Sequence, residues 1–129
     1  MTSRTIETPQ PDWVREEFVD NVENGRVGSR LVSETDALRV WHIELRPGER
    51  LPVHRHVLSY FWTAMTPGKA RSHHQDGSTV EVEYVSGDTR HLEFGPGESM
   101  MHDLENIGET VLVFATVEFK TSGNPPLPV

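Results

Sequence analysis

Apolar and polar residues alternate along most of the chain after residue 26. The alternation is clearest in two segments that carry a large apolar residue at every second position: Trp41, Ile43 and Leu45, then Val80, Val82 and Tyr84. Neighbouring residues of a β-strand point to opposite faces of a sheet, so this period indicates half-buried antiparallel strands. Turn-forming residues separate such segments about every ten residues, as in β-sandwiches and β-barrels. The pattern therefore predicts an all-β domain over residues 26–120.

The segment before this domain has a helical period instead. Val14, Phe18 and Val22 are spaced four residues apart, which places them on one face of a helix. We predict a short amphipathic helix on the outside of the β domain, preceded by a loose arm over residues 1–11. An extended arm that buries Trp13 and Phe18 against a neighbouring subunit is the alternative.

The last apolar segment differs from the others because both of its faces are apolar. One face carries Val111, Val113 and Ala115, and the other carries Leu112 and Phe114. One of these sets must lie outside the barrel, where an uncovered apolar strand favours association. We therefore predict a homodimer, formed through the outer face of the barrel and the N-terminal segment.

Length and charge narrow the possible functions. The chain has 129 residues, a usual length for one domain. We divide it into an N-terminal arm or short helix (1–25), the barrel (26–120) and a proline-rich tail (121–129). Its 20 acidic and 12 basic residues give a net charge of -8, which argues against a nucleic-acid partner. No segment is apolar enough for a signal peptide or a membrane span, so we expect a cytoplasmic protein without a membrane partner.

The segment 47–56 carries the most specific chemical signal. Its two prolines favour an extended conformation, in which His54 and His56 project to the same face of a strand. Two imidazoles placed in this way can bind one cation at about 2.0 to 2.1 Å. On a solvated strand the same spacing would reflect alternation alone. The chain has no cysteine, so a transition-metal site must use histidine and oxygen ligands.

This segment resembles the first of two sequence motifs that are typical of the cupin superfamily. The glycines and the H-x-H pair of that motif match Gly48, His54, His56 and Gly68. The glutamate of the motif is absent, and Tyr60 or Phe61 stands in its place. The second motif has a looser counterpart with longer spacing, and its matching residues are Gly87, Pro96, Gly97, His102 and Asn106.

The resemblance implies a small single-domain, RmlC-like cupin, which is a double-stranded β-helix, here with a short N-terminal helix or arm. The chain is similar to short bacterial cupins grouped with β-alanine degradation, in which an H-x-H-x-x-x-Y arrangement replaces the glutamate form. By this resemblance His54, His56 and His102 hold a divalent transition metal. Fe²⁺ is the leading choice, and Zn²⁺, Mn²⁺, Ni²⁺ and Cu²⁺ are the others. Tyr60 and Glu98 are candidates for a fourth ligand.

Further residues are assigned to the surroundings of this site. Tyr60 and Arg90 are the candidate catalytic residues. Arg90 is the more informative of the two, because an arginine that points into a barrel must pair with a carboxylate of the protein or of a ligand. Asn106 is a further polar group that can orient a substrate. We expect His73 and His74 in water near a hairpin tip and leave both out of the site. The apolar walls are assigned to Trp62, Phe61, Met65, Met100 and Met101.

These features favour a metal-dependent enzyme that acts on a small organic acid, with dioxygenase chemistry as the leading version. Histidines would hold the metal, and its open positions would take substrate and oxygen. Two alternatives remain, since the fold named by the resemblance serves many functions. One is a non-catalytic cupin that binds or stores a small molecule. The other is a cupin isomerase or lyase.

Overall fold

The computed structural model describes residues 1–129, which form ten strands and one helix. In chain order the elements are β1 (Thr2–Ile6), α1 (Asp12–Asp20), β2 (Arg30–Glu34), β3 (Leu38–Leu45), β4 (Arg50–His56), β5 (Tyr60–Ala64), β6 (Gly68–His73), β7 (Thr79–Tyr84), β8 (Thr89–Leu92), β9 (Met100–Asn106) and β10 (Leu112–Phe119). Glycines with positive φ at Gly48, Gly77, Gly87 and Gly97 form tight turns between strands.

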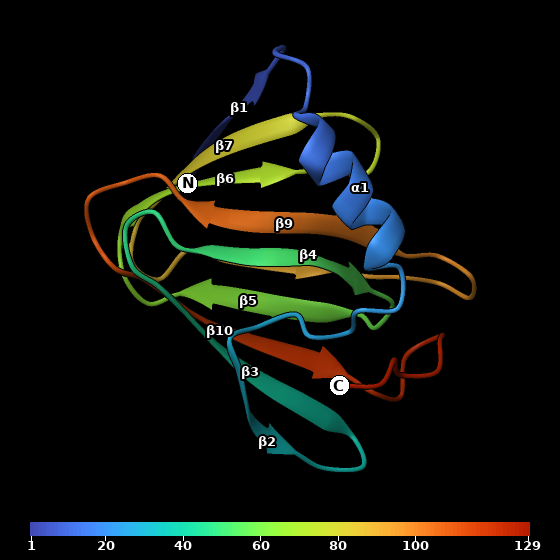
Figure 1. The fold of residues 1–129 in the computed structure, drawn as a ribbon. Coiled ribbons are helices and arrows are strands. Elements are labelled where there is room, and N and C mark those ends of the chain that lie inside the picture. The colour runs from blue at the N-terminus through green and yellow to red at the C-terminus, as the bar shows by residue number, and fades with distance from the viewer.

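The strands form two antiparallel five-stranded sheets that face each other (Figure 1). One sheet, here called sheet A, has the order β1-β7-β6-β9-β4, and sheet B has the order β2-β3-β10-β5-β8. Most neighbouring strands within a sheet are far apart in the sequence, as in a double-stranded β-helix. The predicted all-β fold with a short N-terminal helix is confirmed.

The space between the sheets holds the main apolar core. Alternating residues of the strands supply it, so each strand contributes one face, as the sequence pattern predicts. Its nine buried members are Ile43, Leu45, Leu51, Ala64, Ala70, Tyr84, Leu104, Leu112 and Phe114. Trp62 and Val82 pack against this cluster.

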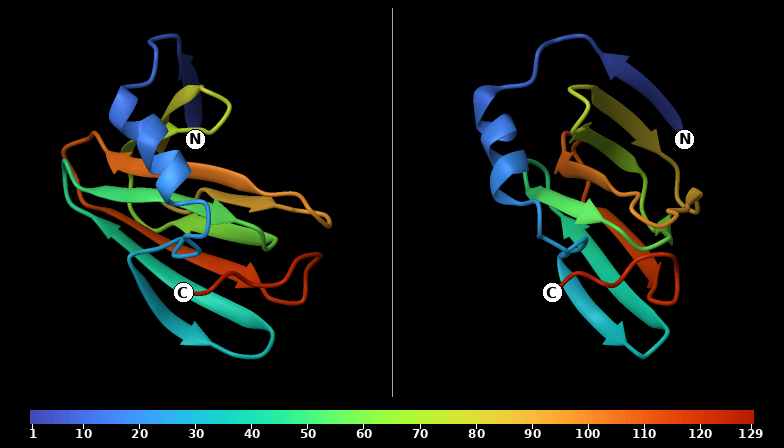
Figure 2. Two further views of the ribbon diagram at one scale, coloured as in Figure 1. Left: turned by 45° about the vertical axis from the view of Figure 1, so that its right-hand side comes forward. Right: turned by 90° about the vertical axis from the view of Figure 1, so that its right-hand side faces the viewer.

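The helix α1 lies on the outer face of sheet A, over the strands β4 and β9 (Figure 2). Its apolar face carries Val14 and Phe18, which pack against Val53 of β4 and Met101 of β9. The predicted amphipathic helix is therefore confirmed, but it ends at Asp20, so Val22 lies beyond it and is exposed. Because the helix covers sheet A, it leaves the outer face of β10, which belongs to sheet B, uncovered.

The two chain ends differ from the sequence-based expectation. Residues 2–6 were expected to be a loose arm, but they form the edge strand β1, in which Thr2 pairs with Glu83 of β7. In the C-terminal tail, the side-chain amide of Asn124 donates hydrogen bonds to the carbonyls of Val57 and Gly95, at 2.9 and 3.0 Å. Both ends are thus held on the barrel by their own chain.

The strand β10 divides its apolar residues between the two faces of sheet B. Leu112 and Phe114 point into the barrel and are buried. Val113, Ala115 and Val117 lie on the opposite face and stay half-exposed. No element of the chain covers this outer face.

The single helix, α1, is neither long enough nor apolar enough to span a membrane.

Candidate metal centre

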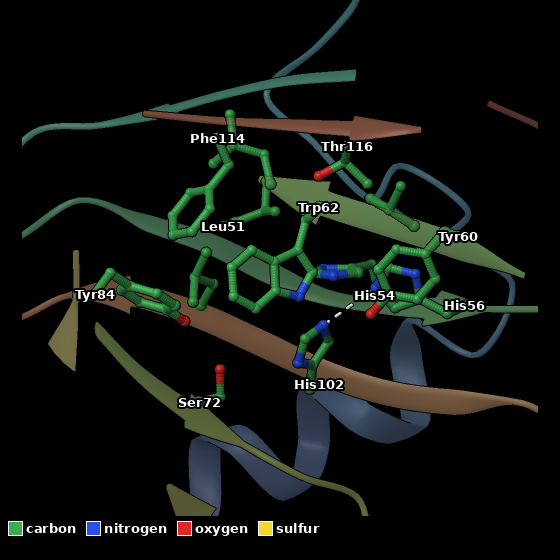
Figure 3. Close-up of a pocket in the computed structure, with 13 residues that line it drawn as sticks. Leu51, His54, His56, Tyr60, Trp62, Ser72, Tyr84, His102, Phe114 and Thr116 are labelled. Atoms are coloured by element: carbon green, nitrogen blue, oxygen red, sulfur yellow. Dashed lines mark hydrogen bonds between the residues drawn. The ribbon is translucent and has the colours of Figure 1, made fainter. Parts of the chain in front are cut away.

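The three predicted metal ligands lie side by side on two neighbouring strands. His54 of β4 pairs directly with His102 of β9, and His56 follows two residues further along β4. All three side chains point into the space between the sheets (Figure 3). Cross-strand pairing, which the sequence does not show, thus brings the two motifs together.

A β-bulge explains why Leu51 and His54 both face inward. The pairing of β4 with β9 shifts by one residue between these positions, where Pro52 has no N–H to donate. Simple alternation would put Leu51 and His54 on opposite faces, but the extra residue returns His54 to the inner one. Val53 then points outward and packs under α1. The bulge therefore allows a core residue, Leu51, and a candidate metal ligand, His54, to lie on the same face of one strand.

The geometry of the three imidazoles fits a single cation. One ring nitrogen from each histidine lies within 4.8 Å of the others, and the Nε2 atoms of His56 and His102 are 3.1 Å apart. Ligands at about 2.1 Å from a metal lie about 3.0 Å apart in octahedral and about 3.4 Å apart in tetrahedral geometry. The 3.1 Å between the Nε2 atoms of His56 and His102 falls between these values. The three-histidine group can therefore bind a divalent transition metal.

Hydrogen bonding and packing orient two of the rings. The Nδ1–H of His54 donates to the carbonyl oxygen of Pro52 at 2.8 Å, which leaves the lone pair of Nε2 free for a metal. His56 has no such partner, and its Nδ1 is buried without a hydrogen bond. Its ring instead lies flat on the ring of Tyr60, with centroids 4.1 Å apart and planes 10° apart. His56 is therefore held by stacking.

Burial keeps these imidazoles neutral. It lowers the pKa of His54 to about 4, against the weaker opposite effect of the hydrogen bond to Pro52. Burial also lowers the pKa of His56 and His102 well below 6.5, and their neighbouring histidines lower it further. Only a neutral imidazole offers a lone pair to a metal. The cluster is therefore ready to bind a cation at neutral pH.

The histidines form one wall of a small cavity of about 70 Å³. Its polar lining residues are the three histidines, Tyr60, Ser72 and Thr116, and the histidines and Tyr60 lie together at one end (Figure 3). Leu51, Tyr84 and Phe114 lie at the opposite, apolar end (Figure 3). The remaining apolar lining residues are Val27, Ile43, Trp62 and Leu104. A cavity of about 150 Å³ is enough for benzene, so this one suits a ligand of only a few non-hydrogen atoms.

Tyr60 is buried at the polar end of this cavity. Its ring lies between His56 and Phe94, whose ring centroid is 6.2 Å away. Its hydroxyl has no hydrogen-bond partner in the chain, and burial raises its pKa. A neutral phenol in this position can donate a hydrogen bond to a ligand in the cavity.

Arg90 lies on the edge strand β8 and is exposed. It pairs across the sheet with Trp62, a residue of the cavity wall, so both side chains lie on the inner face of sheet B. It makes no ion pair or hydrogen bond within the chain. Burial raises the pKa of Tyr60 and Tyr84, and the charge of Arg90 opposes both shifts. Arg90 therefore carries a free positive charge near the cavity.

Two predicted polar groups have structural roles. The carboxylate of Glu98 accepts a hydrogen bond from the backbone N–H of Gly95 at 2.6 Å in an exposed turn, so it is not a fourth metal ligand. The side-chain amide of Asn106 donates to the carbonyls of Leu45 and Thr110, each at 2.8 Å. Asn106 therefore anchors a turn and does not orient a substrate.

Most of the predicted wall residues lie elsewhere. Trp62 lines the cavity, but Phe61 points to the outer face of sheet B, where it pairs with Val117. Met65 is 55% exposed, and Met101 packs under α1. Met100, at the start of β9, is half-exposed and does not line the cavity. The apolar walls come instead from residues on six strands and from Val27 in the loop before β2. No local pattern in the sequence groups these residues together.

His73 and His74 do not lie in open water, as the sequence suggested. His73 is buried on the outer face of sheet A, where its Nδ1 is 2.8 Å from Oδ2 of Asp103. His74 is half-buried and pairs with His102 in an isolated bridge, with ring centroids 5.4 Å apart. The turn that follows them begins at Gln75, where the sequence predicted it, but the two histidines before it are covered by the sheet and its neighbours.

A buried ionic network behind the site was not predicted. Oδ2 of Asp103, which has no exposed surface, accepts hydrogen bonds from Nε and Nη2 of Arg50 at 3.0 and 2.8 Å. The same guanidinium forms a bidentate pair with Glu17 of α1 at 2.9 and 2.7 Å. Trp13 covers the guanidinium at 4.5 Å from its ring centroid. The network ties α1 to both strands that carry the histidines.

Glu17 also completes the interrupted hydrogen bonding of β4. Its Oε1 accepts a bond from the N–H of Val53 at 2.6 Å. The side-chain amides of Asn21 and Asn24 donate to the carbonyl of Val53, each at 2.9 Å. Side chains of α1 and of the segment just after it thus replace the hydrogen bonds to β9 that Val53 loses at the bulge.

Comparison with known proteins identifies the fold. A cupin domain from Bordetella pertussis Tohama I is 24% identical, with a TM-score of 0.62, over 71% of this chain and 91% of that one. An RmlC-like cupin family protein with a double-stranded β-helix fold from Methanocaldococcus jannaschii is 20% identical, with a TM-score of 0.57, over 70% and 76% of the two chains. These similarities show the cupin fold.

Another similarity, over a smaller part of the matched protein, concerns an enzyme. A variant of oxalate decarboxylase from Bacillus subtilis is 27% identical, with a TM-score of 0.50, over 64% of this chain and 21% of that one. No protein-family model and no curated protein matches the sequence. The predicted similarity to cupins grouped with β-alanine degradation therefore stays a prediction.

Proposed function

We propose that this chain with the cupin fold is a metal-dependent enzyme that acts on a small organic acid. The observation that carries the proposal is the buried cluster of His54, His56 and His102 on the wall of a cavity. Three neutral imidazoles suit divalent first-row metals and leave coordination positions open towards the cavity. Open positions distinguish a catalytic metal site from a structural one.

The preferred metal is Fe²⁺, and the preferred reaction is a dioxygenation. Iron held by three histidines would supply oxygen chemistry, with open positions for both substrate and oxygen. No carboxylate replaces the glutamate of the cupin motif, so the bound cation would keep its full positive charge. This charge favours an anionic ligand. The apolar end of the cavity, around Phe114, would exclude water from the reacting atoms.

The acidic nature of the substrate rests on Arg90. Its guanidinium has no carboxylate partner in the chain although the protein carries a net charge of -8. A guanidinium beside a cavity wall residue, here Trp62, and without a protein partner suits a carboxylate of a ligand. The cavity of about 70 Å³ holds a few non-hydrogen atoms of this ligand, and a longer acid would extend out of it.

Tyr60 is assigned two separable contributions. Its ring supports His56 by stacking, which positions a metal ligand. Its hydroxyl, free of protein partners, would donate a hydrogen bond to the bound acid or to a developing negative charge. The protein would therefore use the ring to hold the site and the hydroxyl to act on the substrate.

The decisive experiment is metal analysis of protein purified without an affinity tag, followed by turnover assays. We expect about one transition-metal ion per chain and oxygen uptake with at least one short-chain acid. His56→Ala should lose both, while His91→Ala, which changes an exposed histidine of β8, should lose neither. Metal-free wild-type protein that stays inactive after loading with each of the five candidate metals would contradict the proposal.

A lyase is the second candidate, because the oxalate decarboxylase similarity favours it. Release of carbon dioxide without net oxygen uptake would identify a decarboxylase. Stoichiometric oxygen uptake would identify a dioxygenase. Metal binding without turnover of any acid would leave a non-catalytic binding or storage protein.

A further inference from the structure

His74 extends the row of histidines across the inner face of sheet A. His54 and His102 are cross-strand partners, and His102 is also the partner of His74, just beyond the end of β6. Directly paired residues of antiparallel strands project to the same face. Ser72 lies two residues before His74 and points into the cavity beside His102 (Figure 3). His74 therefore also projects inward, next to the metal centre.

The backbone of His74 is fixed while its ring remains free. Its N–H donates to the carbonyl of Ser78 at 2.9 Å. Its carbonyl accepts bonds from the side-chain amide of Gln10 at 2.8 Å and from the N–H of Gly77 at 3.1 Å. Neither ring nitrogen has a hydrogen-bond partner in the chain. The imidazole is thus positioned at the cavity with its hydrogen-bonding capacity unused.

His74 lies at the edge of the metal centre and not within it. Its ring centroid is 5.4 Å from that of His102, but its nitrogens are outside the group of ligand atoms that lie within 4.8 Å of one another. Its ring is half-buried, whereas His54 and His56 are each 2% exposed. This position suits contact with a ligand that extends outward from the metal.

Arg90 approaches the same place from the opposite sheet. It lies on the inner face of the edge strand β8, beside Trp62. Trp62 lies across the cavity from His102, the strand partner of His74 (Figure 3). Arg90 and His74 therefore border the same cavity from opposite sheets. In keeping with this, burial lowers the pKa of His74 and the charge of Arg90 lowers it further. Tyr60 and Tyr84, which line the cavity, also experience this charge.

We propose that His74 and Arg90 together form an anion-binding site at the mouth of the cavity, and that this site binds the distal carboxylate of a short diacid. The other end of the diacid would lie at the metal centre. Arg90 offers a planar fork for two parallel hydrogen bonds to a carboxylate. His74 adds one N–H donor, which a neutral imidazole supplies. The proposal rests on the proposed function and defines its substrate class.

The test measures binding of short acids to the metal-loaded full-length chain. Oxalate, malonate and succinate are compared with acetate, propionate and butyrate by calorimetric titration. We expect the wild type to prefer a diacid over the monoacid of equal length. His74→Asn and Arg90→Gln should each weaken diacid binding by about tenfold and monoacid binding by clearly less, with metal content unchanged in His74→Asn.

Two controls remove a similar side chain outside the proposed site. His91→Asn changes a neighbour of Arg90 that lies on the outer face of β8. Arg46→Gln removes an exposed positive charge that has no ion-pair partner. Both variants should bind diacids as the wild type does. This outcome would show that the effect of Arg90 does not arise from net charge.

The outcomes separate this inference from the function on which it rests. Equal weakening of monoacids and diacids, or unchanged diacid binding in both variants, would overturn the distal site. Loss of metal in His74→Asn would also overturn it, because His74 would then act at the metal. A wild type that holds metal and prefers diacids but converts none of them would refute the proposed enzyme while supporting the binding site.

Discussion

The buried carboxyl group of Glu118 offers a test of the barrel's electrostatics. Glu118 is 3% exposed and points inward from β10. Its Oε1 accepts a hydrogen bond from the indole N–H of Trp41 at 2.7 Å. Burial raises its pKa from 4.5 to about 7, although the bond from Trp41 and the charge of Arg39 act in the opposite direction. The folded protein therefore holds a proton on Glu118 that the unfolded chain releases.

This difference sets the sign and the size of a pH effect on stability. Below pH 4.5 both states are protonated, and Glu118 carries no penalty. As the pH rises towards 7, only the unfolded chain ionises freely, so the free energy of unfolding falls. One pKa unit corresponds to about 1.36 kcal/mol, so the full penalty above pH 7 is about 3 kcal/mol. Glu118→Gln keeps an acceptor for Trp41 and removes this penalty.

The assay is urea unfolding followed by tryptophan fluorescence at several pH values between about 4.5 and 8.5. A chelator in every sample prevents metal release from entering the comparison. We expect Glu118→Gln to match the wild type at the acid end and to be more stable by up to about 3 kcal/mol at the alkaline end. Glu44→Gln, which changes an exposed residue of β3 without an ion pair, serves as the control.

A constant difference between Glu118→Gln and the wild type over this pH range would refute the reasoning. It would mean that Glu118 is ionised in the folded protein as it is in the unfolded chain. A difference that grows towards acid pH would reverse the sign, and would show that the hydrogen bond from Trp41 outweighs burial.

Four other predictions follow from the site and the outer surface. His56→Ala should lose bound metal in elemental analysis yet keep the circular dichroism of a folded β-protein; global unfolding would make the metal structural. Tyr60→Phe should keep metal affinity and lose turnover, whereas Tyr60→Leu should lose turnover and weaken metal binding as well. If the two variants bind metal equally well, the ring and the hydroxyl do not have separate roles. Asp103→Asn should lower the free energy of unfolding by about 3 kcal/mol in urea titrations, because Arg50 loses a buried partner; a neutral effect would show that the network adds no stability. Sedimentation should show a homodimer that Val117→Glu, on the outer face of sheet B, converts to monomer, and a wild type of 14.6 kDa would rule out the dimer.

The sequence predicts strands best where one face of the strand is buried and the other is exposed to solvent. The alternation around Trp41 and Val82 therefore identified β3 and β7. The strand β1 was missed because four of its five residues are exposed and show no apolar period. Its pairing with β7 depends on backbone hydrogen bonds that leave no trace in the side chains. The position of α1 on sheet A was equally hidden, since an apolar helix face does not specify which sheet it covers.

The candidate site was predicted in part for a similar reason. His54 and His56 form a local pattern, and the family resemblance added His102. Asp103 and His74 have no local pattern that marks them, because their partners are distant in sequence: Asp103 contacts Arg50, and His74 pairs with His102. Such contacts arise from strand register. A bulge at Pro52 shifts that register, and the sequence alone does not show it.

The attachment of α1 to Val53 has a consequence for how the protein opens. The N–H and the carbonyl of Val53 bond to side chains of Glu17, Asn21 and Asn24 and not to β9. Detachment of the helix would therefore leave β4 without partners one residue before His54. The helix and the ligand strand should open as one unit in native-state hydrogen exchange. Metal binding would then slow amide exchange in α1, although no residue of this helix is among the three ligands.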